Sequence, residues 1–365
     1  MFSDLIDFND LPHSEWENLF NLGLDIYDNP KDYGDYCKGK ILAAMFYEPS
    51  TRTNFSFQSA MMRLGGKTIG FSETSSTSVS KGETLKDTVK IVSNYADVMV
   101  IRHPSEGAAY AASLYSSVPV INAGDGGHLH PTQTMTDLFT VGKLKNKKMT
   151  GLEIGICGDL LYGRTVHSLL KAFALYSGNT FYFISTPYLK VPEYYINILR
   201  KNNNIIITGT IEECIEKLDI IYMTRIQRER FASEEEYKKQ AGIYVLDKEK
   251  LSRAKKDLTI MHPLPKNNEI CSQIDDDPRA QYFKQAELGL YIRMALLIKI
   301  LENPKPVMSA GSNTDKKCAN KNCIVNKEKN LPDIIKKNDG KICCAYCEHE
   351  IIQKSEDRFF ESAPL

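Results

Sequence analysis

The 365-residue sequence lacks three features, and each absence excludes a class of function. It has no surplus of positive charge, because 46 Lys and Arg residues balance 46 Asp and Glu residues. Nucleic-acid-binding and polybasic membrane-surface proteins need such a surplus. It has no uncharged apolar run near the ~18 residues of a membrane span, and its acidic start, MFSDLIDFND, lacks the layout of a signal peptide. We therefore expect a cytoplasmic protein with no nucleic-acid and no membrane partner.

The residues that are present are those of an ordinary globular protein, with 42% apolar and 25% charged residues. Short aliphatic runs alternate with amphipathic stretches. The runs expected as strands are 40–47, 97–103, 118–124, 152–158, 180–185, 205–209, 219–225 and 258–263. Near-continuous apolar strands separated by helices are typical of parallel sheets covered on both faces. The sequence therefore predicts the α/β class.

The length predicts two or three domains at ~150 residues per domain. A helix expected over 131–150 ends in a basic polar turn before the strand–helix alternation restarts, and we place a domain boundary there. We expect two doubly wound parallel-sheet domains, a linker rich in Pro, Gly, Ser and Lys, and a small C-terminal domain. Their expected limits are 1–140 together with a closing helix at 288–303, then 141–287, 304–317 and 318–365.

Ligands in open α/β sheets bind beyond the carboxyl ends of the strands. After the strand expected at 40–47 comes the run Pro-Ser-Thr-Arg-Thr, which offers hydroxyls, unpaired backbone N–H groups and a guanidinium to a phosphate. The alternative is that Ser50 or Thr51 caps a helix while Arg52 lies on the surface. This run alone does not separate the two interpretations.

Other strand ends also carry polar side chains or carbonyls. They supply Arg102, His130 with Gln133, Arg164, Arg225 with Gln227, and the bend at Pro263 and Leu264. A loop histidine is often structural, but a neutral imidazole just before the helix-starting Pro131 can donate a hydrogen bond to a substrate carbonyl. Four arginines at strand ends in a chain of zero net charge favour a small polyanionic substrate that bears phosphate and carboxylates.

Seven motifs, in the same order over about residues 1–303, resemble the aspartate carbamoyltransferase catalytic chain. They are PSTRT at 49–53, SVSKGET at 78–84, RHP at 102–104, NAGDG with HPTQT at 122–134, GDLLYGRTVHS at 158–168, YMTRIQRER at 222–230 and HPLP at 262–265. The resemblance implies transfer of the carbamoyl group from carbamoyl phosphate to L-aspartate in de novo pyrimidine biosynthesis. It implies no organic cofactor.

The resemblance also implies a role for individual residues. Phosphate would be held by Ser50, Thr51, Arg52, Thr53 and Arg102. The carbamoyl carbonyl would be polarised by Arg52, Thr53 and His130, and its nitrogen would be bound by Gln133 and the carbonyls of Pro263 and Leu264. The aspartate carboxylates would be bound by Arg164, Arg225 and Gln227. The reaction then needs no protein nucleophile, so positioning and electrostatics supply most of the rate enhancement.

In the family, a serine and a lysine from one subunit reach the neighbouring subunit's site. Here Lys81 matches the lysine and Thr77 takes the hydroxyl position, which implies a homotrimer with shared active sites and leaves any higher assembly open. Three residues depart from the family pattern. Asn54 and Gln58 stand where Arg and Glu are frequent, and Leu161 stands where many members have lysine.

Cysteines crowd into the tail of the chain. Cys318 with Cys323 and Cys344 with Cys347 form two pairs, and two pairs in a reducing compartment suit a tetrahedral structural zinc site. An iron–sulfur role is the alternative. We leave Cys343 out, because adjacent residues rarely both reach one metal. The tail resembles the zinc-binding domain of the aspartate carbamoyltransferase regulatory chain, without the nucleotide-binding domain that precedes it there.

Two other functions compete with aspartate carbamoylation. Ornithine carbamoyltransferase shares the phosphate loop and the HPTQ element, but it typically carries HCLP where this chain has HPLP. Arg225 moreover suits a substrate carboxylate rather than an amine. A catalytically silent subunit that uses the zinc module for assembly is the second competitor, and the complete set of substrate ligands argues against it.

Overall fold

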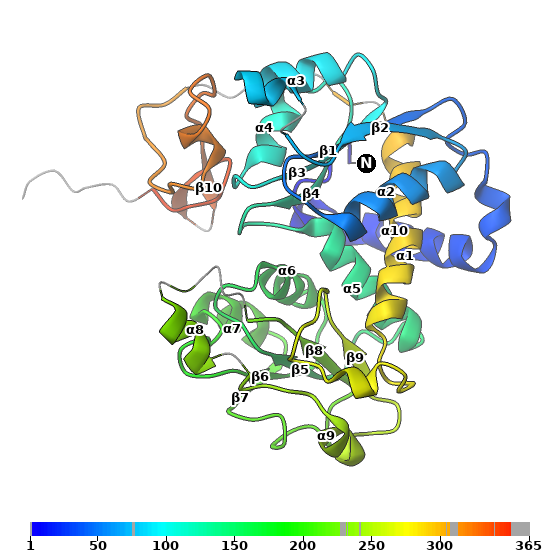
Figure 1. The fold of residues 1–365 in the computed structure, drawn as a ribbon, viewed down its shortest axis with the longest axis vertical. Helices are drawn as coiled ribbons and strands as arrows, with labels where there is room; N and C mark the ends of the chain where they lie inside the picture. Colours follow the sequence, from blue (N-terminus) through cyan, green and yellow to red (C-terminus); the bar gives the residue numbers. More distant parts are fainter. Residues whose placement is uncertain are drawn as a thin grey trace, which may run out of the picture.

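The computed structural model describes residues 2–74, 77–226, 231, 233–240, 242–303, 305–306, 313–338 and 340–351. The first domain is built on a parallel sheet of order β2-β1-β3-β4 (Figure 1). Its strands are β1 (Ile41–Phe46), β2 (Lys67–Phe71), β3 (Val98–His103) and β4 (Val120–Asp125). The expectation missed β2, because this edge strand is mostly exposed and has no continuous apolar run.

Six helices of the described chain pack with this sheet. They are α1 (His13–Asp28), α2 (Thr51–Arg63), α3 (Leu85–Val92), α4 (Ala108–Tyr115), α5 (Pro131–Leu144) and α10 (Tyr282–Glu302). Although α10 comes after the second sheet in the chain, it contacts α1, α2 and α5. It begins at Tyr282 rather than at the expected residue 288. The sequence pattern does not show the first turns, because there the polar Gln285 is buried and the apolar Phe283 is exposed.

The second domain carries a five-stranded sheet of order β7-β6-β5-β8-β9, in which every pairing is parallel. Its strands are β5 (Glu153–Cys157), β6 (Thr180–Ile184), β7 (Asn204–Thr208), β8 (Ile220–Met223) and β9 (Thr259–Met261). Its helices are α6 (Arg164–Phe173), α7 (Glu193–Arg200), α8 (Glu234–Gln240) and α9 (Lys248–Arg253). The two parallel-sheet α/β domains expected from the sequence are therefore confirmed.

Short 3₁₀ helices complete the described elements. They are η1 (Phe8–Asp10), η2 (Pro30–Tyr33), η3 (Ser78–Lys81), η5 (Ser272–Ile274) and η6 (Ile324–Asn326). Across the described ranges, no helix is both long and apolar enough to cross a membrane.

The C-terminal module, which we define as residues 313–351, folds around an antiparallel hairpin of β10 (Ile335–Asn338) and β11 (Lys341–Cys344). It lies beside the first domain of its own chain (Figure 1). Ile324, Leu331 and Tyr346 share one apolar cluster with residues of α3 and α4. Gly107 has a φ of 80°, and a Cβ there would lie 2.5 Å from Tyr346, so only glycine permits this contact.

Candidate active site

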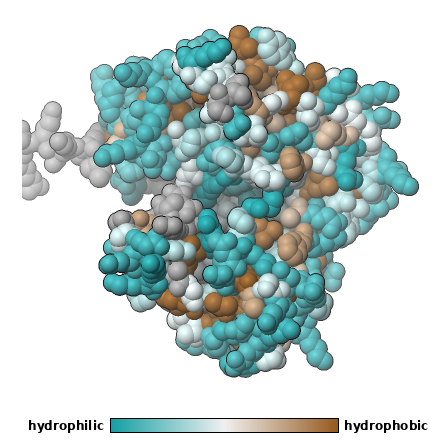
Figure 2. Space-filling view, in the orientation of Figure 1, coloured by the Kyte–Doolittle hydropathy of each residue, from teal (hydrophilic) through white to brown (hydrophobic). Residues whose placement is uncertain are grey.

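A cavity of about 810 Å³ lies between the two domains, at the carboxyl ends of both parallel sheets. Figure 2 shows mainly hydrophilic side chains around the opening between the two lobes. Of the residues predicted from the sequence, the cavity is lined by Ser50, Thr51, Arg52, Thr53, Arg102, His130, Gln133, Arg164, Arg225, Pro263 and Leu264. Residues more than 200 positions apart thus meet in one site, as the strand-end rule predicts.

The first strand end supplies a cationic corner. Ser50 is the N-cap residue of α2, yet its side chain makes no capping bond, so the hydroxyl is available to a ligand. Burial lowers the pKa of Arg52, and the nearby charge of Arg102 lowers it further. Arg102 is held by Glu48, with Nη2 and Oε1 2.6 Å apart. Two adjacent guanidiniums at a helix N-terminus are suited to a phosphate dianion.

His130 occupies the N-cap position of α5, directly before Pro131, and is buried. Burial lowers its pKa well below the ordinary value, and Arg164, Arg102 and Arg293 add to the effect. The imidazole is therefore neutral at physiological pH. A neutral imidazole among arginines can donate to a carbonyl oxygen without competing for the anion.

Sequence reasoning missed a buried carboxyl that does not line the cavity but holds residues that do. Asp137 on α5 accepts hydrogen bonds from Gln133 Nε2 at 2.7 Å, Gln285 Nε2 at 2.6 Å and Tyr222 Oη at 2.8 Å. Gln285 in turn accepts from the backbone N–H of His262 at 3.0 Å. Asp137 thus fixes Gln133 on one wall and the segment before Pro263 on the other. Its partners come from distant elements, so no local signal marks it.

Arg293 was also missed, although an arginine inside the apolar run of α10 is a signal that could have found it. It is 5% exposed, lines the cavity and donates to Ser56 Oγ at 3.1 Å. Its guanidinium lies over the ring of Phe57. Burial lowers its pKa to about 10, so it stays charged at neutral pH.

The proton held by Asp137 makes the free energy of unfolding depend on pH. Burial raises its pKa from 3.8 to about 7 despite its three donors. The folded state therefore holds this proton more tightly than the unfolded state, and the favourable contribution is complete below pH ~4 and lost as the pH rises to ~7. We expect the unfolding free energy of the parent, relative to Asp137→Asn, to fall by up to about 4 kcal/mol across this window. Denaturant titrations at several pH values measure this, and the exposed Asp276→Asn is the control. A difference that grows with pH would contradict the assignment.

The second domain supplies the opposite wall. Arg164 is the first residue of α6 and donates to the carbonyl of Gly126 across the domain boundary. Arg225 follows β8, and Pro263 and Leu264 follow β9. His262 Nε2 lies 2.8 Å from Glu269 Oε1, while its Nδ1 accepts from the Leu264 N–H at 2.7 Å, so the bend after β9 is held in place.

Two predicted residues lie outside the cavity of their own chain, and a third is not among the described residues. Thr77 is the N-cap residue of η3 and Lys81 is its last residue, and neither lines the cavity of its own chain. Gln227 lies outside the described residues.

The departures from the family pattern have local explanations. Gln58 Nε2 donates to Asn54 Oδ1 at 2.6 Å, so a neutral amide pair occupies two positions where the family often has Arg and Glu. Leu161 lines a separate small cavity of about 240 Å³, together with Phe183, Val191 and Ile196. None of these residues replaces a residue of the main cavity's predicted ligand set.

The four predicted metal ligands come together in the C-terminal module. The Sγ atoms of Cys318, Cys323, Cys344 and Cys347 all lie within 4.8 Å of one another. Cys318 and Cys347 are 3.6 Å apart, and Cys323 and Cys344 are 3.8 Å apart. A tetrahedron with metal–sulfur distances of ~2.3 Å has edges of ~3.8 Å, so the buried group fits one metal ion with no open position. Cys343 is not part of it.

The module also touches the edge of the cavity. Asn322 lines it, and its carbonyl accepts from the N–H of Glu106 at 2.9 Å. Asn320 donates to the carboxylate of Glu106 at 2.6 Å. The module is therefore bound to the first domain of its own chain next to the site.

Fold and cavity together define an α/β enzyme that binds small polyanions between two domains. The carbamoyl phosphate-binding domain model of aspartate/ornithine carbamoyltransferases matches residues 3–143, and the aspartate/ornithine-binding domain model matches residues 150–300. The chain belongs to this family of carbamoyltransferases.

Three of its relatives are aspartate carbamoyltransferases. The aspartate carbamoyltransferase catalytic subunit of Clostridium botulinum (strain Eklund 17B / Type B) is 57% identical over 299 residues, which cover 81% of this chain and 97% of the relative. The structure of the catalytic subunit of M. Jannaschii aspartate transcarbamoylase matches with a TM-score of 0.77 and 43% identity, over 82% of this chain and 98% of that chain. A Trypanosoma cruzi aspartate transcarbamoylase, in complex with carbamoyl phosphate and aspartate, matches with a TM-score of 0.77 and 32% identity, over 82% of this chain and 96% of that chain.

Proposed function

We propose that this chain transfers the carbamoyl group of carbamoyl phosphate to L-aspartate, giving N-carbamoyl-L-aspartate and phosphate. The observation that carries the proposal is that five arginines from both domains line one cavity: Arg52, Arg102, Arg164, Arg225 and Arg293. A phosphate and two carboxylates together need such a cationic site. The 57% identity to an aspartate carbamoyltransferase catalytic subunit supports the choice of aspartate.

In this proposal, the predicted ligands bind different parts of the two substrates. The phosphate is held by Ser50, Thr51, Arg52, Thr53 and Arg102, and the carbamoyl oxygen is polarised by Arg52, Thr53 and His130. The carbamoyl nitrogen is bound by Gln133 and the carbonyls of Pro263 and Leu264. The aspartate carboxylates are bound by Arg164, Arg225 and Gln227. The amine attacks the carbonyl carbon, and the departing phosphate accepts the amine's proton. Donors placed before the reaction stabilise the developing oxyanion, so no protein nucleophile takes part.

The finer assignments complete the proposal. The divisions are residues 1–140 with 288–303 for carbamoyl phosphate, 141–287 for aspartate, 304–317 as linker and 318–365 as a zinc domain like that of the regulatory chain. Zinc suits the four cysteines structurally.

Lys81 and Thr77 complete a neighbouring subunit's site in a homotrimer. Phe55, Met62 and Ile69 are more than 40% exposed on the first domain, and a neighbouring subunit would cover such residues.

The choice between aspartate and ornithine rests on Arg225. We expect Arg225→Ala to lower kcat/KM for aspartate about 10- to 150-fold, because one hydrogen-bonded charge contact of ~1.5–3 kcal/mol is lost. The KM for carbamoyl phosphate should stay near the parental value. Steady-state assays that offer aspartate and ornithine side by side measure both effects.

The matched control is Arg253→Ala, which removes an exposed arginine of the same domain that pairs with Glu216. It should leave both kinetic constants unchanged. If Arg225→Ala keeps the parental kcat/KM for aspartate, or if the parent carbamoylates ornithine in preference, the proposed substrate is wrong.

A further inference from the structure

Glu348 follows the last cysteine of the metal group and has an unusual backbone conformation. Its φ is 61°, in the left-handed region that favours glycine or asparagine. Its N–H donates to the carbonyl of Cys344 at 3.0 Å, which closes the turn between the two cysteines. A residue with a long side chain rarely adopts this conformation, and such backbone outliers cluster at functional sites.

The carboxylate of Glu348 meets cations from three parts of the chain. Its Oε1 lies 2.6 Å from Lys336 Nζ within the module. Its Oε2 lies 3.6 Å from His128 Nε2 in the first domain and 3.9 Å from Lys171 Nζ in the second. The side chains of Glu348, His128 and Lys171 are only 22%, 12% and 19% exposed, so solvent screens these contacts less than at an open surface.

His128 belongs to the loop between β4 and α5, which also contains Gly126 and His130. Its Nδ1 lies 3.1 Å from Asp125 Oδ2. Asp125 also accepts from the N–H groups of Gly107 at 2.7 Å and Leu129 at 3.0 Å. A group that holds His128 therefore holds a loop whose other residues line the cavity.

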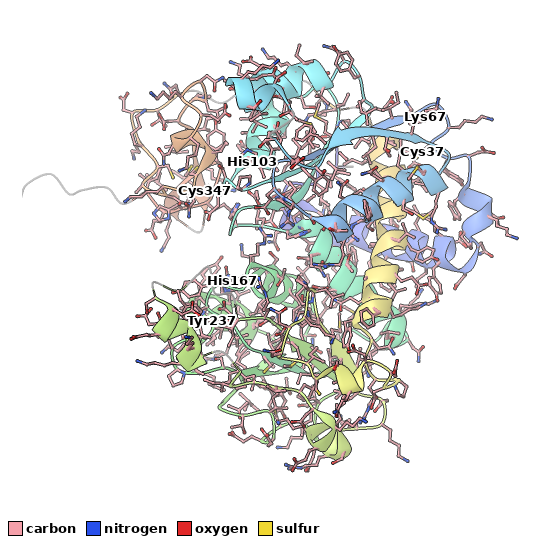
Figure 3. All side chains as sticks on the ribbon, in the orientation of Figure 1. Cys37, Lys67, His103, His167, Tyr237 and Cys347 are labelled. Atoms are coloured by element: carbon pink, nitrogen blue, oxygen red, sulfur yellow. The ribbon has the colours of Figure 1, made fainter. Side chains whose placement is uncertain are left out.

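Lys171 belongs to α6, the helix that begins with Arg164. In Figure 1, α6 lies on the side of the second domain that faces the first domain, and the module lies beside the first domain. Figure 3 places Cys347, the neighbour of Glu348, in the module and His167 on α6. Arg164 joins α6 to the 125–130 loop directly through Gly126, and Lys171, Glu348 and His128 form a second connection between the same two elements.

We propose that Glu348 is a positioning residue that sets how closely α6 approaches the 125–130 loop. It touches no substrate and acts through Lys171 and His128. Because α6 carries Arg164, the effect falls on aspartate rather than on carbamoyl phosphate, an assignment that rests on the proposed function. Without this tie, the second domain spends less time in the binding-competent position, and the apparent affinity falls by that fraction.

The first test is Glu348→Gln, which keeps the shape of the side chain and removes its charge. We expect KM for aspartate to rise about threefold to tenfold, with kcat and KM for carbamoyl phosphate near the parental values. Lys171→Gln should give the same change, and the double variant should add little to either single one. The matched control is Glu350→Gln, which removes an exposed carboxylate that pairs with Lys341 in the same module and should change neither constant.

A second variant separates positioning from support of the module. Glu348→Gly suits the left-handed backbone, so the module should keep its metal and its thermal midpoint while KM for aspartate still rises. Metal loss that accompanies a raised KM in both Glu348 variants would overturn the positioning role. So would a parental KM in both.

Hydrogen exchange gives a readout that needs no turnover. In the ligand-free Glu348→Gln chain, the amides of α6 and the 125–130 loop should exchange faster than in the parent, and those of β6 should not. Unchanged exchange would overturn the inference. If the parent proved inactive with aspartate, the proposed function would fail on that assay alone, and the exchange result would still decide the role of Glu348.

Discussion

Arg52→Ala and Lys81→Ala are each expected to be nearly inactive, with kcat/KM lowered by about two to three orders of magnitude, and a mixture of the two should recover activity. Each variant loses a cation that the developing charge needs in a water-excluded site. If one subunit supplies Arg52 and its neighbour supplies Lys81, random reassembly of an equal mixture gives about one intact site in four over all trimers, the unmixed ones included. Dissociation, mixing and reassembly, followed by an assay, measure the recovery.

The positions of Arg52 and Lys81 in one chain agree with a site that two subunits share. Arg52 lines the cavity of its own chain, whereas Lys81 is exposed and lies outside that cavity. Lys90→Ala, an exposed lysine on α3, is the control: it should be active by itself. No recovery in verified mixed trimers would show that both residues serve the same subunit's site.

Much of the fold could be predicted because it rests on local signals. Every apolar run expected as a strand is one, and the polar residues after those strands meet in one cavity because parallel strands end at the same edge. The edge strand β2 escaped prediction, since its exposed side chains carry no apolar run. The start of α10 was missed because Gln285, a polar residue of the kind expected at the surface, is buried there.

The part of the site that escaped prediction depends on contacts between distant elements. Asp137 is one acidic residue in an otherwise ordinary helix, and its importance appears only when Tyr222 from β8 and Gln285 from α10 converge on it. The docking of the module depends likewise on Gly107 and Tyr346, which lie far apart in the sequence.

We expect removal of the metal from the four cysteines to unfold the C-terminal module. A structural zinc ion contributes about 10–16 kcal/mol of apparent binding free energy in small zinc modules, and this energy is folding energy. We expect the purified parent to contain one zinc per chain, and a chelator to unfold the module. Cys344→Ser should lose the zinc, and metal analysis with limited proteolysis of the tail measures both results.

Cys343→Ser is the matched control, because Cys343 is the buried neighbour of Cys344 but is not part of the metal group. It should retain one zinc per chain. The apolar cluster that the module shares with α3 and α4 adds a second consequence, since unfolding of the module exposes Leu85 and Val89 of the first domain. The thermal midpoint of Cys344→Ser should therefore fall for the first domain as well as for the tail. A Cys344→Ser chain that keeps a full zinc content and a parental midpoint would show that the four cysteines hold no structural metal.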